Sequence, residues 1–274
     1  MTLLRNTEFI AFDLETTGLH PAGSQIVEIG AVRFRGDGTV LAQFQQLIDP
    51  GCPIPRHATA VHGISDRDVQ GQPTIREALQ RFLEFVRQAP SIMMAHNAAF
   101  DLGFLSFALG RLREPCPDAP VVDTLRLSRH RLPLPNHKLE TIGRHLQLID
   151  DEEHRALADT LLLKDVFLHL IGRRPAIQSV AQLFEVCPAW SFEARGALVD
   201  RPPAGFEDLW RAIGSQQPLT LVYDGGNQPG VARVVTPLGV VRTRGQLYLS
   251  ALCHASGIEK TFRLDKIVSY RRKS

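Results

Sequence analysis

The sequence predicts two domains of different class: an α/β domain over residues 6–172 and a small all-β domain over residues 205–274. Two patterns carry this prediction. Segments near the amino terminus alternate apolar and polar residues with the period of a β-strand, and helical patterns follow them. The carboxy-terminal residues instead hold short strand-like runs separated by glycine and proline. At 274 residues the chain can form two domains that each bury a core.

The α/β domain opens with three predicted strands, over residues 8–15, 26–35 and 39–48. In the first, apolar residues alternate with polar ones, so Asp13 and Glu15 project from the same face near the strand's end. Two such carboxylates repel each other, and hard cations such as Mg²⁺ or Mn²⁺ bind this kind of all-oxygen environment. The pair is therefore a candidate metal site, although an Asp-x-Glu pair alone is a weak signal.

The rest of the α/β domain is predicted as helices around one more strand. A capping box of Thr74 and Glu77 starts a helix that runs to about residue 88. Residues 91–95 form a short apolar strand that leads into His-Asn-Ala-Ala-Phe-Asp at 96–101, and Asp101 begins the next helix, where the helix dipole favours a carboxylate. Further helices are predicted to begin at Val121 and to cover residues 139–148 and 160–171.

His154 and Asp159 are five residues apart, close to the last of these helices. Positions five apart are separated by about 140° around an ideal helix. Both side chains can therefore meet one centre only if His154 precedes the helix and Asp159 lies within it. The acidic run at 150–153 favours an exposed start to this segment.

Composition and charge limit the class of protein. Hydrophobic content of 44% and charged content of 22% are ordinary for a globular protein, and without an apolar leader or a membrane-length run we expect a cytoplasmic location. The four cysteines are scattered, which argues against a zinc site. Residues 205–274 hold 10 Lys/Arg and 5 Asp/Glu, whereas the first 204 hold 21 and 24. Either small domains vary this much by chance, or a basic module accompanies an acidic, metal-binding domain.

Four acids on separate elements, with a histidine beside the last, form an ordered set. Phe-Asp-x-Glu-Thr-Thr-Gly at 12–18, His-Asn-x-x-Phe-Asp at 96–101 and His-x-Ala-x-x-Asp at 154–159 follow one another along the chain. Residues 6–172 therefore resemble the DEDDh family of 3′–5′ exonucleases, which contains the proofreading subunit of bacterial replicative polymerase. All five family positions are present. The resemblance implies an enzyme with a ribonuclease-H-like fold, a mixed five-stranded sheet flanked by helices.

The resemblance also assigns roles to these residues. Phosphodiester hydrolysis can use two divalent cations about 3.5–4 Å apart, here two Mg²⁺ or Mn²⁺ ions. Asp13, Glu15 and Asp159 would bind the ion that activates the water, with Asp13 bridging to the second ion and Asp101 reaching that ion partly through water. His154 would take the proton of the water. The residues implied around the terminal nucleotide are Thr16, Leu19, His62 and a base-stacking Phe100, with His96 and Asn97 supporting the site.

The carboxy-terminal domain begins with a short predicted helix, and five short strands follow at 219–223, 230–235, 239–243, 246–253 and 259–263. This pattern predicts a small barrel. Its motifs at 222–223, 233–238, 246–249 and 261–267 resemble the WYL domain, an Sm/SH3-like barrel of bacterial regulators and DNA-processing proteins, although Leu247 replaces the tryptophan of the name motif.

The WYL resemblance implies a ligand surface that includes Arg233, Tyr248 and Arg263 and binds nucleic acid or a nucleotide. The net charge of this domain, with Arg242 and Arg244 near these residues, favours contact with phosphates. Alternatively, Tyr248 packs inside the barrel and the arginines only cover its surface.

Residues 173–204 contain four prolines and are predicted to be a partly ordered linker. Leu183 and Phe184 in this stretch resemble a sliding-clamp peptide. Val180, however, stands where that motif has glutamine, so clamp or polymerase association is weakly supported.

The favoured function is a metal-dependent 3′–5′ exonuclease that releases nucleoside monophosphates from single-stranded or frayed DNA 3′ ends in repair or processing. An RNA 3′-end trimming exoribonuclease would need the same catalytic set and stays open as an alternative. A third possibility is a regulator whose barrel senses a nucleotide and gates the nuclease.

Overall fold

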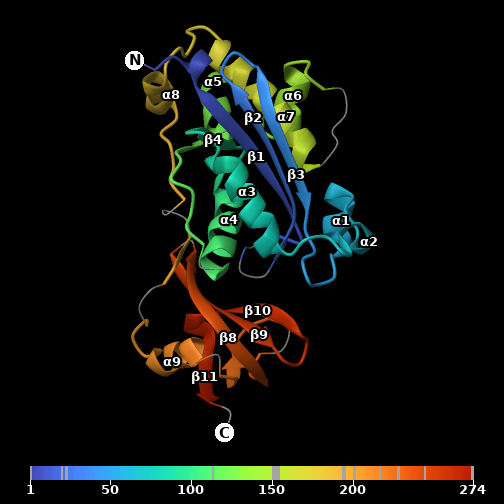
Figure 1. Ribbon diagram of the computed structural model, residues 1–274, viewed down its shortest axis with the longest axis vertical. Helices are drawn as coiled ribbons and strands as arrows, with labels where there is room; N and C mark the ends of the chain where they lie inside the picture. The colour runs from blue at the N-terminus through green and yellow to red at the C-terminus, as the bar shows by residue number, and fades with distance from the viewer. Residues whose placement is uncertain are drawn as a thin grey trace. The chain divides into compact units, whose positions relative to one another are not determined.

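The computed structural model describes residues 2–19, 21, 24–112, 114–149, 155–192, 196–199, 202–215, 217–226, 229–243 and 245–272 (Figure 1). The chain divides into two compact units, each built around one β-sheet.

Among the described residues of the first unit, five strands form a mixed sheet in the order β3-β2-β1-β4-β5. These strands are β1 (Glu8–Thr16), β2 (Ile26–Arg35), β3 (Val40–Leu47), β4 (Ile92–Ala95) and β5 (Val121–Asp123). The first three pair antiparallel, whereas β4 pairs parallel with both β1 and β5. The mixed five-stranded sheet is therefore confirmed, and the four strands predicted from periodicity match β1 to β4.

The fifth strand differs from the prediction, in which Val121 opens a helix. Residues 121–123 form β5, and the helix α5 (Thr124–Arg131) starts after them. All three side chains of β5 are buried, so the strand shows no alternation of apolar and polar residues. Asp123 is both the last residue of β5 and the N-cap of α5, where its carboxylate accepts the N–H of Leu125 at 3.1 Å.

Helices cover both faces of this sheet. Figure 1 shows α3 (Ile75–Arg87) and α7 (Ala156–Gly172) on opposite faces. The predicted capping box of Thr74 and Glu77 starts α3. The other helices in this part of the chain are α1 (Arg56–His62), α2 (Asp66–Val69), α4 (Ala99–Leu112), α6 (Leu139–His145), α8 (Val180–Val186) and the 3₁₀ turn η1 (Leu4–Asn6). No helix within the described ranges is long and apolar enough to cross a membrane.

Phenylalanine rings hold the central strand β1 from both sides. On one face Phe9 packs against Phe167 of α7, with ring centroids 5.0 Å apart. On the other face Phe12 packs against Phe82 of α3 at 6.2 Å. All four rings are buried, and burying such a side chain contributes about 1.5–3 kcal/mol. The core therefore fixes the strand that carries the first two predicted metal ligands.

An arginine holds the carboxyl end of α7. Arg131, the last residue of α5, donates from Nε to the Leu170 carbonyl at 3.0 Å and from Nη2 to the carbonyls of Arg173 and Pro175 at 2.8 and 2.7 Å. The last carbonyls of a helix lack partners within the helix, and a cation suits the negative end of the helix dipole. The helix that carries Asp159 in its first turn is thus anchored at its far end.

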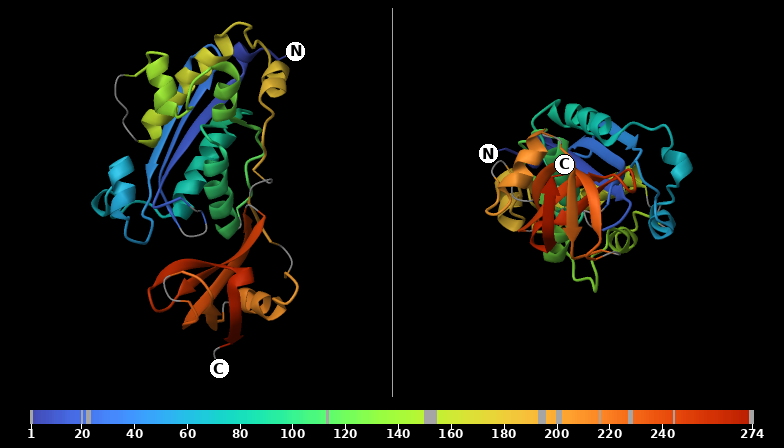
Figure 2. Two further views of the ribbon diagram at one scale, coloured as in Figure 1. Left: turned by 180° about the vertical axis from the view of Figure 1, so that it is seen from behind. Right: turned by 90° about the horizontal axis from the view of Figure 1, so that it is seen from below.

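The strands described in the second unit pair in the order β10-β9-β8-β7-β11, with β6 beside β8. They appear in orange to red in Figure 1 and Figure 2. They are β6 (Gly196–Leu198), β7 (Leu219–Tyr223), β8 (Ala232–Thr243), β9 (Gln246–Cys253), β10 (Ile258–Arg263) and β11 (Ile267–Arg272), together with α9 (Glu207–Ser215) and the 3₁₀ turn η2 (Leu264–Lys266). The pairing leaves β10 and β11 at the two ends of the order, so closure into a barrel is not confirmed and stays a prediction.

Two of the predicted strands in this unit, 230–235 and 239–243, are one strand. The strand β8 continues through Pro237, where its pairing with β9 shifts register before Gly239. A proline lacks the N–H that a regular ladder needs, and an irregularity in the ladder accommodates it. In addition, β11 has no counterpart among the predicted strands.

The region predicted as a linker contains a helix that belongs to the core of the first unit. Leu183 of α8 is fully buried there, and Phe184 packs against the same core. A peptide that binds a sliding clamp must present its apolar side chains to the partner. The burial of Leu183 therefore argues against clamp association through this segment.

Candidate active site

Three predicted metal ligands come together at the carboxyl end of β1. One carboxylate oxygen from each of Asp13, Glu15 and Asp159 lies within 4.8 Å of the others; we call these three residues the acid cluster. The strand period places the first two on one face, and α7 brings Asp159 onto that face from its first turn. On the neighbouring strand β2, Gly30 lies opposite Asp13 and Glu28 lies opposite Glu15.

Asp101 approaches the acid cluster from the first turn of α4 and is only 2% exposed. Its carboxylate accepts the backbone N–H of Leu14. Its Oδ1 atom is buried and has no hydrogen-bond partner in the part of the chain that the structure describes. Burial of an unpaired carboxylate oxygen is costly. The orphaned oxygen therefore fits a site that a cation, or a water bound to a cation, would complete.

The electrostatics of the site point the same way. Burial, followed by the charges of Asp101, Glu15 and Asp159, raises the pKa of Asp13 well above its ordinary value. Burial and the neighbouring carboxylates raise the pKa of Glu15 to about 8, and burial raises the pKa of Asp101 to about 8. Carboxylates that oppose each other's ionisation so strongly need compensating positive charge, and Mg²⁺ or Mn²⁺ prefers this set of oxygen ligands. The four acids therefore fit the two divalent cations that the resemblance implies.

Asp123, which sequence reasoning missed, holds the turn before α4. Asn97 has a φ of 64°, a left-handed conformation that is uncommon for a residue with a side chain. Oδ1 of Asp123 accepts the N–H groups of Asn97 at 3.1 Å and Ala98 at 3.3 Å, in addition to its helix-capping bond. This turn leads directly into α4, so Asp123 helps to set the position of Asp101. The local sequence around Asn97 holds no sign of it, because only the pairing of β4 with β5 brings the two segments together.

His96 supports the same turn from the other side. Its Nδ1 lies 3.0 Å from the hydroxyl oxygen of Thr124, and its Nε2 lies 2.7 Å from the carbonyl oxygen of His137. Burial lowers the pKa of His96, although the His137 carbonyl acts in the opposite direction. Both ring nitrogens are engaged by the protein, which suits a supporting role.

His62 is the last residue of α1 and is buried next to Thr16. Its Nδ1 accepts the N–H of Ile64 at 3.0 Å, whereas its Nε2 is buried without a hydrogen-bond partner among the described residues. Burial lowers the pKa of His62, although the backbone of Thr16 acts in the opposite direction. Because Nδ1 accepts from Ile64, the proton of the neutral ring lies on Nε2.

The other predicted nucleotide contacts differ in exposure. The Thr16 hydroxyl donates to the Gly18 carbonyl at 2.7 Å and is largely buried, so its hydrogen is committed to the turn after β1. Leu19, which follows this turn, is 73% exposed. Phe100 lies half-buried in the first turn of α4, one residue before Asp101. Of these, Leu19 has the most free apolar surface for a base or sugar.

His154 lies outside the described residues. Asp159 is in the first turn of α7, which begins at Ala156. The predicted position of Asp159 within the helix therefore holds, and the role of His154 stays a prediction.

The predicted ligand residues of the second unit do not share one face of the sheet. The guanidinium of Arg233 lies over the ring of Phe262, a core residue, 5.9 Å from its centroid. Tyr248 and Arg263 are cross-strand neighbours, and they face away from the side that Phe262 occupies because successive residues of a strand point to opposite faces. Arg263 also forms an ion pair with Asp265 at 2.6 Å. The structure thus brings Tyr248 and Arg263 together and separates them from Arg233.

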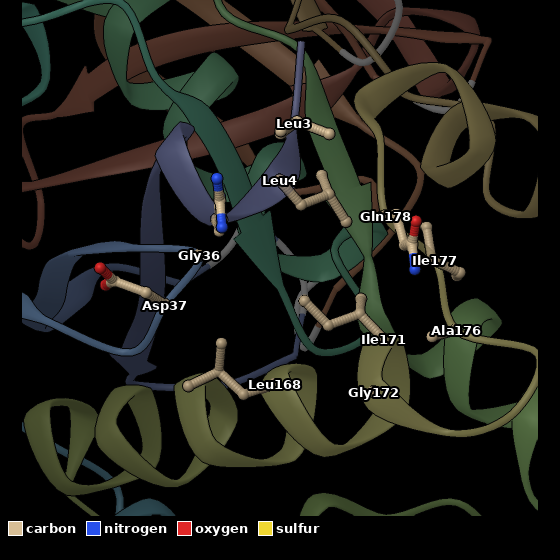
Figure 3. Close-up of a pocket in the computed structure, with 11 residues that line it drawn as sticks. Leu3, Leu4, Gly36, Asp37, Leu168, Ile171, Gly172, Ala176, Ile177 and Gln178 are labelled. Carbon is tan, nitrogen blue, oxygen red and sulfur yellow. The ribbon is translucent and has the colours of Figure 1, made fainter. Parts of the chain in front are cut away.

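A cavity of about 650 Å³ lies beyond the amino-terminal end of β1 (Figure 3), whereas the acid cluster lies at the carboxyl end of this strand. Its walls come from the chain before β1, the turn between β2 and β3, and the end of α7. It is lined by Leu3, Leu4, Arg5, Gly36, Asp37, Leu168, Ile171, Gly172, Ala176, Ile177 and Gln178. None of the predicted site residues is among them, so this cavity is separate from the candidate active site.

Comparison with known proteins identifies both parts of the chain. The profile of the Exonuclease family matches residues 10–167, and the profile of the WYL domain matches residues 204–272. DNA polymerase III PolC-type of Clostridium perfringens is 40% identical over 153 residues, which are 56% of this chain and 10% of that protein. The same polymerase of Caldanaerobacter subterraneus subsp. tengcongensis is 34% identical over 182 residues, 65% of this chain and 13% of the relative. The chain thus spans about a tenth of the length of these relatives.

Solved structures share the fold. Exonuclease X in complex with 5′ overhanging duplex DNA has a TM-score of 0.51 and 23% identity, covering 65% of this chain and 98% of its own. E. coli exonuclease I in complex with a dA16 oligonucleotide has a TM-score of 0.58 and 17% identity, covering 90% and 55%. The nuclease domain of 3′hExo, a DEDDh family member bound to rAMP, has a TM-score of 0.55 and 16% identity, covering 62% and 94%. Because the family profile spans more than half of the sequence and the predicted acids converge within it, the chain belongs to the exonuclease family and carries a WYL domain in its carboxy-terminal part.

Proposed function

We propose that this protein is a metal-dependent 3′–5′ exonuclease that releases nucleoside monophosphates from single-stranded or frayed DNA ends. The observation that carries the proposal is the convergence of Asp13, Glu15 and Asp159 within 4.8 Å. The orphaned Oδ1 of Asp101 beside them supports it. A structural role for four neighbouring acids would lower stability with no compensation, whereas a role in holding cations explains their presence.

The residues of the chain supply a rigid frame for hydrolysis. Divalent cations bound to Asp13, Glu15, Asp101 and Asp159 would supply an activated water and neutralise charge on the scissile phosphate. The acids on β1 are held by a strand that is buried on both faces, so their carboxylates need little reorganisation during the reaction. His62, buried next to Thr16 at the end of β1, is proposed to approach the terminal nucleotide from the end of α1. His154 is proposed to accept the proton of the attacking water.

DNA is the favoured substrate because the curated relatives are DNA polymerases and two of the solved structures contain DNA. RNA trimming is the second candidate, since the related nuclease domain of 3′hExo is bound to rAMP. The two substrates differ at the 2′-hydroxyl, which a protein can read directly. A comparison of DNA and RNA of one sequence therefore separates the candidates.

The test is degradation of 3′- and 5′-labelled single strands of DNA and RNA by the wild type and by Asp13→Asn, with Mg²⁺, Mn²⁺ or EDTA. We expect stepwise loss from the 3′ end that EDTA abolishes and that Asp13→Asn lowers about 100- to 1,000-fold, because removing a residue that stabilises developing charge costs about 10²–10³-fold. Asp118→Asn, at an exposed aspartate, is the matched control and should retain full activity. Cleavage that survives EDTA, or full activity of Asp13→Asn, would refute the proposal.

For the second unit, we propose a closed Sm/SH3-like barrel that binds nucleic acid or a nucleotide through Tyr248 and the basic residues near it. Arg263, the cross-strand neighbour of Tyr248, is the residue to test. Arg263→Gln should weaken binding of a long oligonucleotide and reduce the slope of log affinity against log salt by about 1, whereas Arg144→Gln in the first unit should leave that slope unchanged. If the barrel instead senses a nucleotide and gates the nuclease, a mononucleotide will change turnover on short oligonucleotides.

A further inference from the structure

We propose that Glu28 is a positioning residue of the active site: from β2 it holds the first turn of α7, and with it Asp159, in register with Asp13 and Glu15. The role in catalysis rests on the proposed exonuclease function, whereas the role in forming the metal site does not. Glu28 belongs to none of the three motifs in the sequence. Its contacts carry the inference.

Glu28 is completely buried, yet its carboxylate is fully engaged. Oε1 accepts from Nη2 of Arg155 at 2.7 Å and from Nε2 of Gln45 at 2.9 Å. Oε2 accepts from Nε of Arg155 at 3.2 Å and from the backbone N–H of Ala156 at 3.1 Å. A buried carboxylate is tolerated when it is paired in this way. The bonds from Arg155 and Ala156 link β2 to residues more than 120 positions later in the chain, at the start of α7.

The start of α7 lacks a cap of its own. Arg155 is the N-cap residue, and its side chain makes no capping hydrogen bond. The first N–H groups of a helix need partners from outside the helix, and a negative charge is favourable there. Glu28 supplies both, because it accepts the N–H of Ala156 with a charged carboxylate. The N–H of Asp159 in turn bonds the carbonyl of Arg155 at 3.0 Å. One helical turn therefore separates the contact made by Glu28 from the third residue of the acid cluster.

The backbone of α7 also rests directly on β2 at this point. A Cβ atom on Gly30 would lie 2.3 Å from the carbonyl carbon of Ala156. Glu28 and Gly30 are two residues apart in β2, so both face α7, and they lie opposite Glu15 and Asp13. Close contact at Gly30 and hydrogen bonds at Glu28 together fix both the distance and the rotation of the first turn.

A purely electrostatic role of Arg155 and a positioning role predict opposite effects on cation binding by the acid cluster. The cation of Arg155 lies near the acid cluster and opposes the rise in the pKa of Glu15. If charge alone mattered, removing this cation would strengthen the binding of another cation to the cluster. If Arg155 and Glu28 act together to position the first turn of α7, the same change will weaken that binding.

The test is calorimetric titration of the full-length protein with Mn²⁺, for the wild type, Arg155→Gln and Glu28→Gln. Arg155 is 42% exposed on its side chain, so its replacement is compatible with folding. Arg144→Gln is the control, because it removes a surface ion pair with Glu140 of similar length, 2.6 Å. We expect Arg155→Gln and Glu28→Gln to weaken Mn²⁺ binding about 10- to 100-fold, as is typical for groups that orient metal ligands. The control should stay within about twofold of the wild type.

Activity on a 3′-labelled oligonucleotide gives the second readout. Misplaced ligands should lower kcat by a similar factor, because the metal ligands act in the chemical step, whereas KM for the oligonucleotide should change less than about twofold. The inference is wrong if Arg155→Gln binds Mn²⁺ as tightly as the wild type or more tightly. If Glu28→Gln does not fold, the Mn²⁺ affinity of Arg155→Gln alone is the test. If the wild type binds Mn²⁺ and the two variants bind it more weakly, but the wild type degrades no substrate, only the proposed function is overturned. A wild type that binds no Mn²⁺ would overturn both.

Discussion

Replacing Gly30 with alanine tests whether the contact between β2 and α7 sets the geometry of the acid cluster. The added Cβ would lie 2.3 Å from the carbonyl carbon of Ala156 and 2.5 Å from the nitrogen of Leu157. Ordinary van der Waals contacts of a Cβ begin at 3.4 Å. Both obstacles are backbone atoms, which cannot rotate away as a side chain can. The start of α7 must therefore move outward by about 1 Å, the difference between these distances, and Asp159 moves with it.

A displacement of about 1 Å in a catalytic group is expected to lower the rate about 100-fold. The free energy of unfolding should fall by about 1–3 kcal/mol, as is typical for an overpacked contact. The assay is the rate of 3′-end degradation under saturating Mn²⁺, with thermal unfolding measured on the same preparation. Gly172→Ala is a matched control on the same helix, because nothing lies within 4 Å of the Cβ that it adds. If Gly30→Ala folds and retains a rate within about twofold of the wild type, the argument from close packing is wrong.

Three further predictions follow from the site and its supports. Between about pH 4 and pH 8 the native protein holds protons on Glu15 and Asp101, whose pKa values are raised to about 8, whereas the unfolded chain has released them. The melting temperature in EDTA should therefore fall as the pH rises from 5 to 8. Asp101→Asn should make this fall smaller. A melting temperature that rises over this range would contradict the assignment. Asp123→Ala leaves three backbone N–H groups without their acceptor. We therefore expect the free energy of unfolding in urea to fall by about 1–3 kcal/mol, together with reduced activity. Asp123→Asn, which keeps one side-chain oxygen, should recover part of both the stability and the activity. Arg131→Met should lower the unfolding free energy by about 1–3 kcal/mol with kcat unchanged, because it leaves carbonyls at the end of α7, far from Asp159, without their hydrogen-bond donor. A large loss of kcat in this variant would show that the far end of α7 also determines the geometry of the active site.

The sequence was most informative where function and local geometry coincide. Asp13 and Glu15 lie on one face of a strand because the strand period requires it, and the structure places their carboxylates together. Asp159 had to lie within a helix if it was to join them, and it does. These inferences needed only the spacing of residues within one element.

Features that depend on two distant segments could not be predicted in this way. Glu28 appears in the sequence as a polar residue within an apolar strand, and its partners at 155 and 156 are known only from the fold. The predicted helix begins at Val121 instead of after Asp123, because a strand of three buried residues has no periodicity to reveal it. The predicted break between residues 235 and 239 is absent, because Pro237 is accommodated by a register shift that involves the partner strand β9.

The shortness of β4 has a consequence for which insertions the chain can tolerate. The strand is four residues long and pairs with β1 only as far as Ala11 opposite Met94. Past that point the N–H of Leu14 is taken by the carboxylate of Asp101. Extending β4 by two residues would continue the ladder along β1 and displace the turn that delivers Asp101. The length of β4 therefore limits the geometry of the active site, and insertions in this strand should be tolerated poorly.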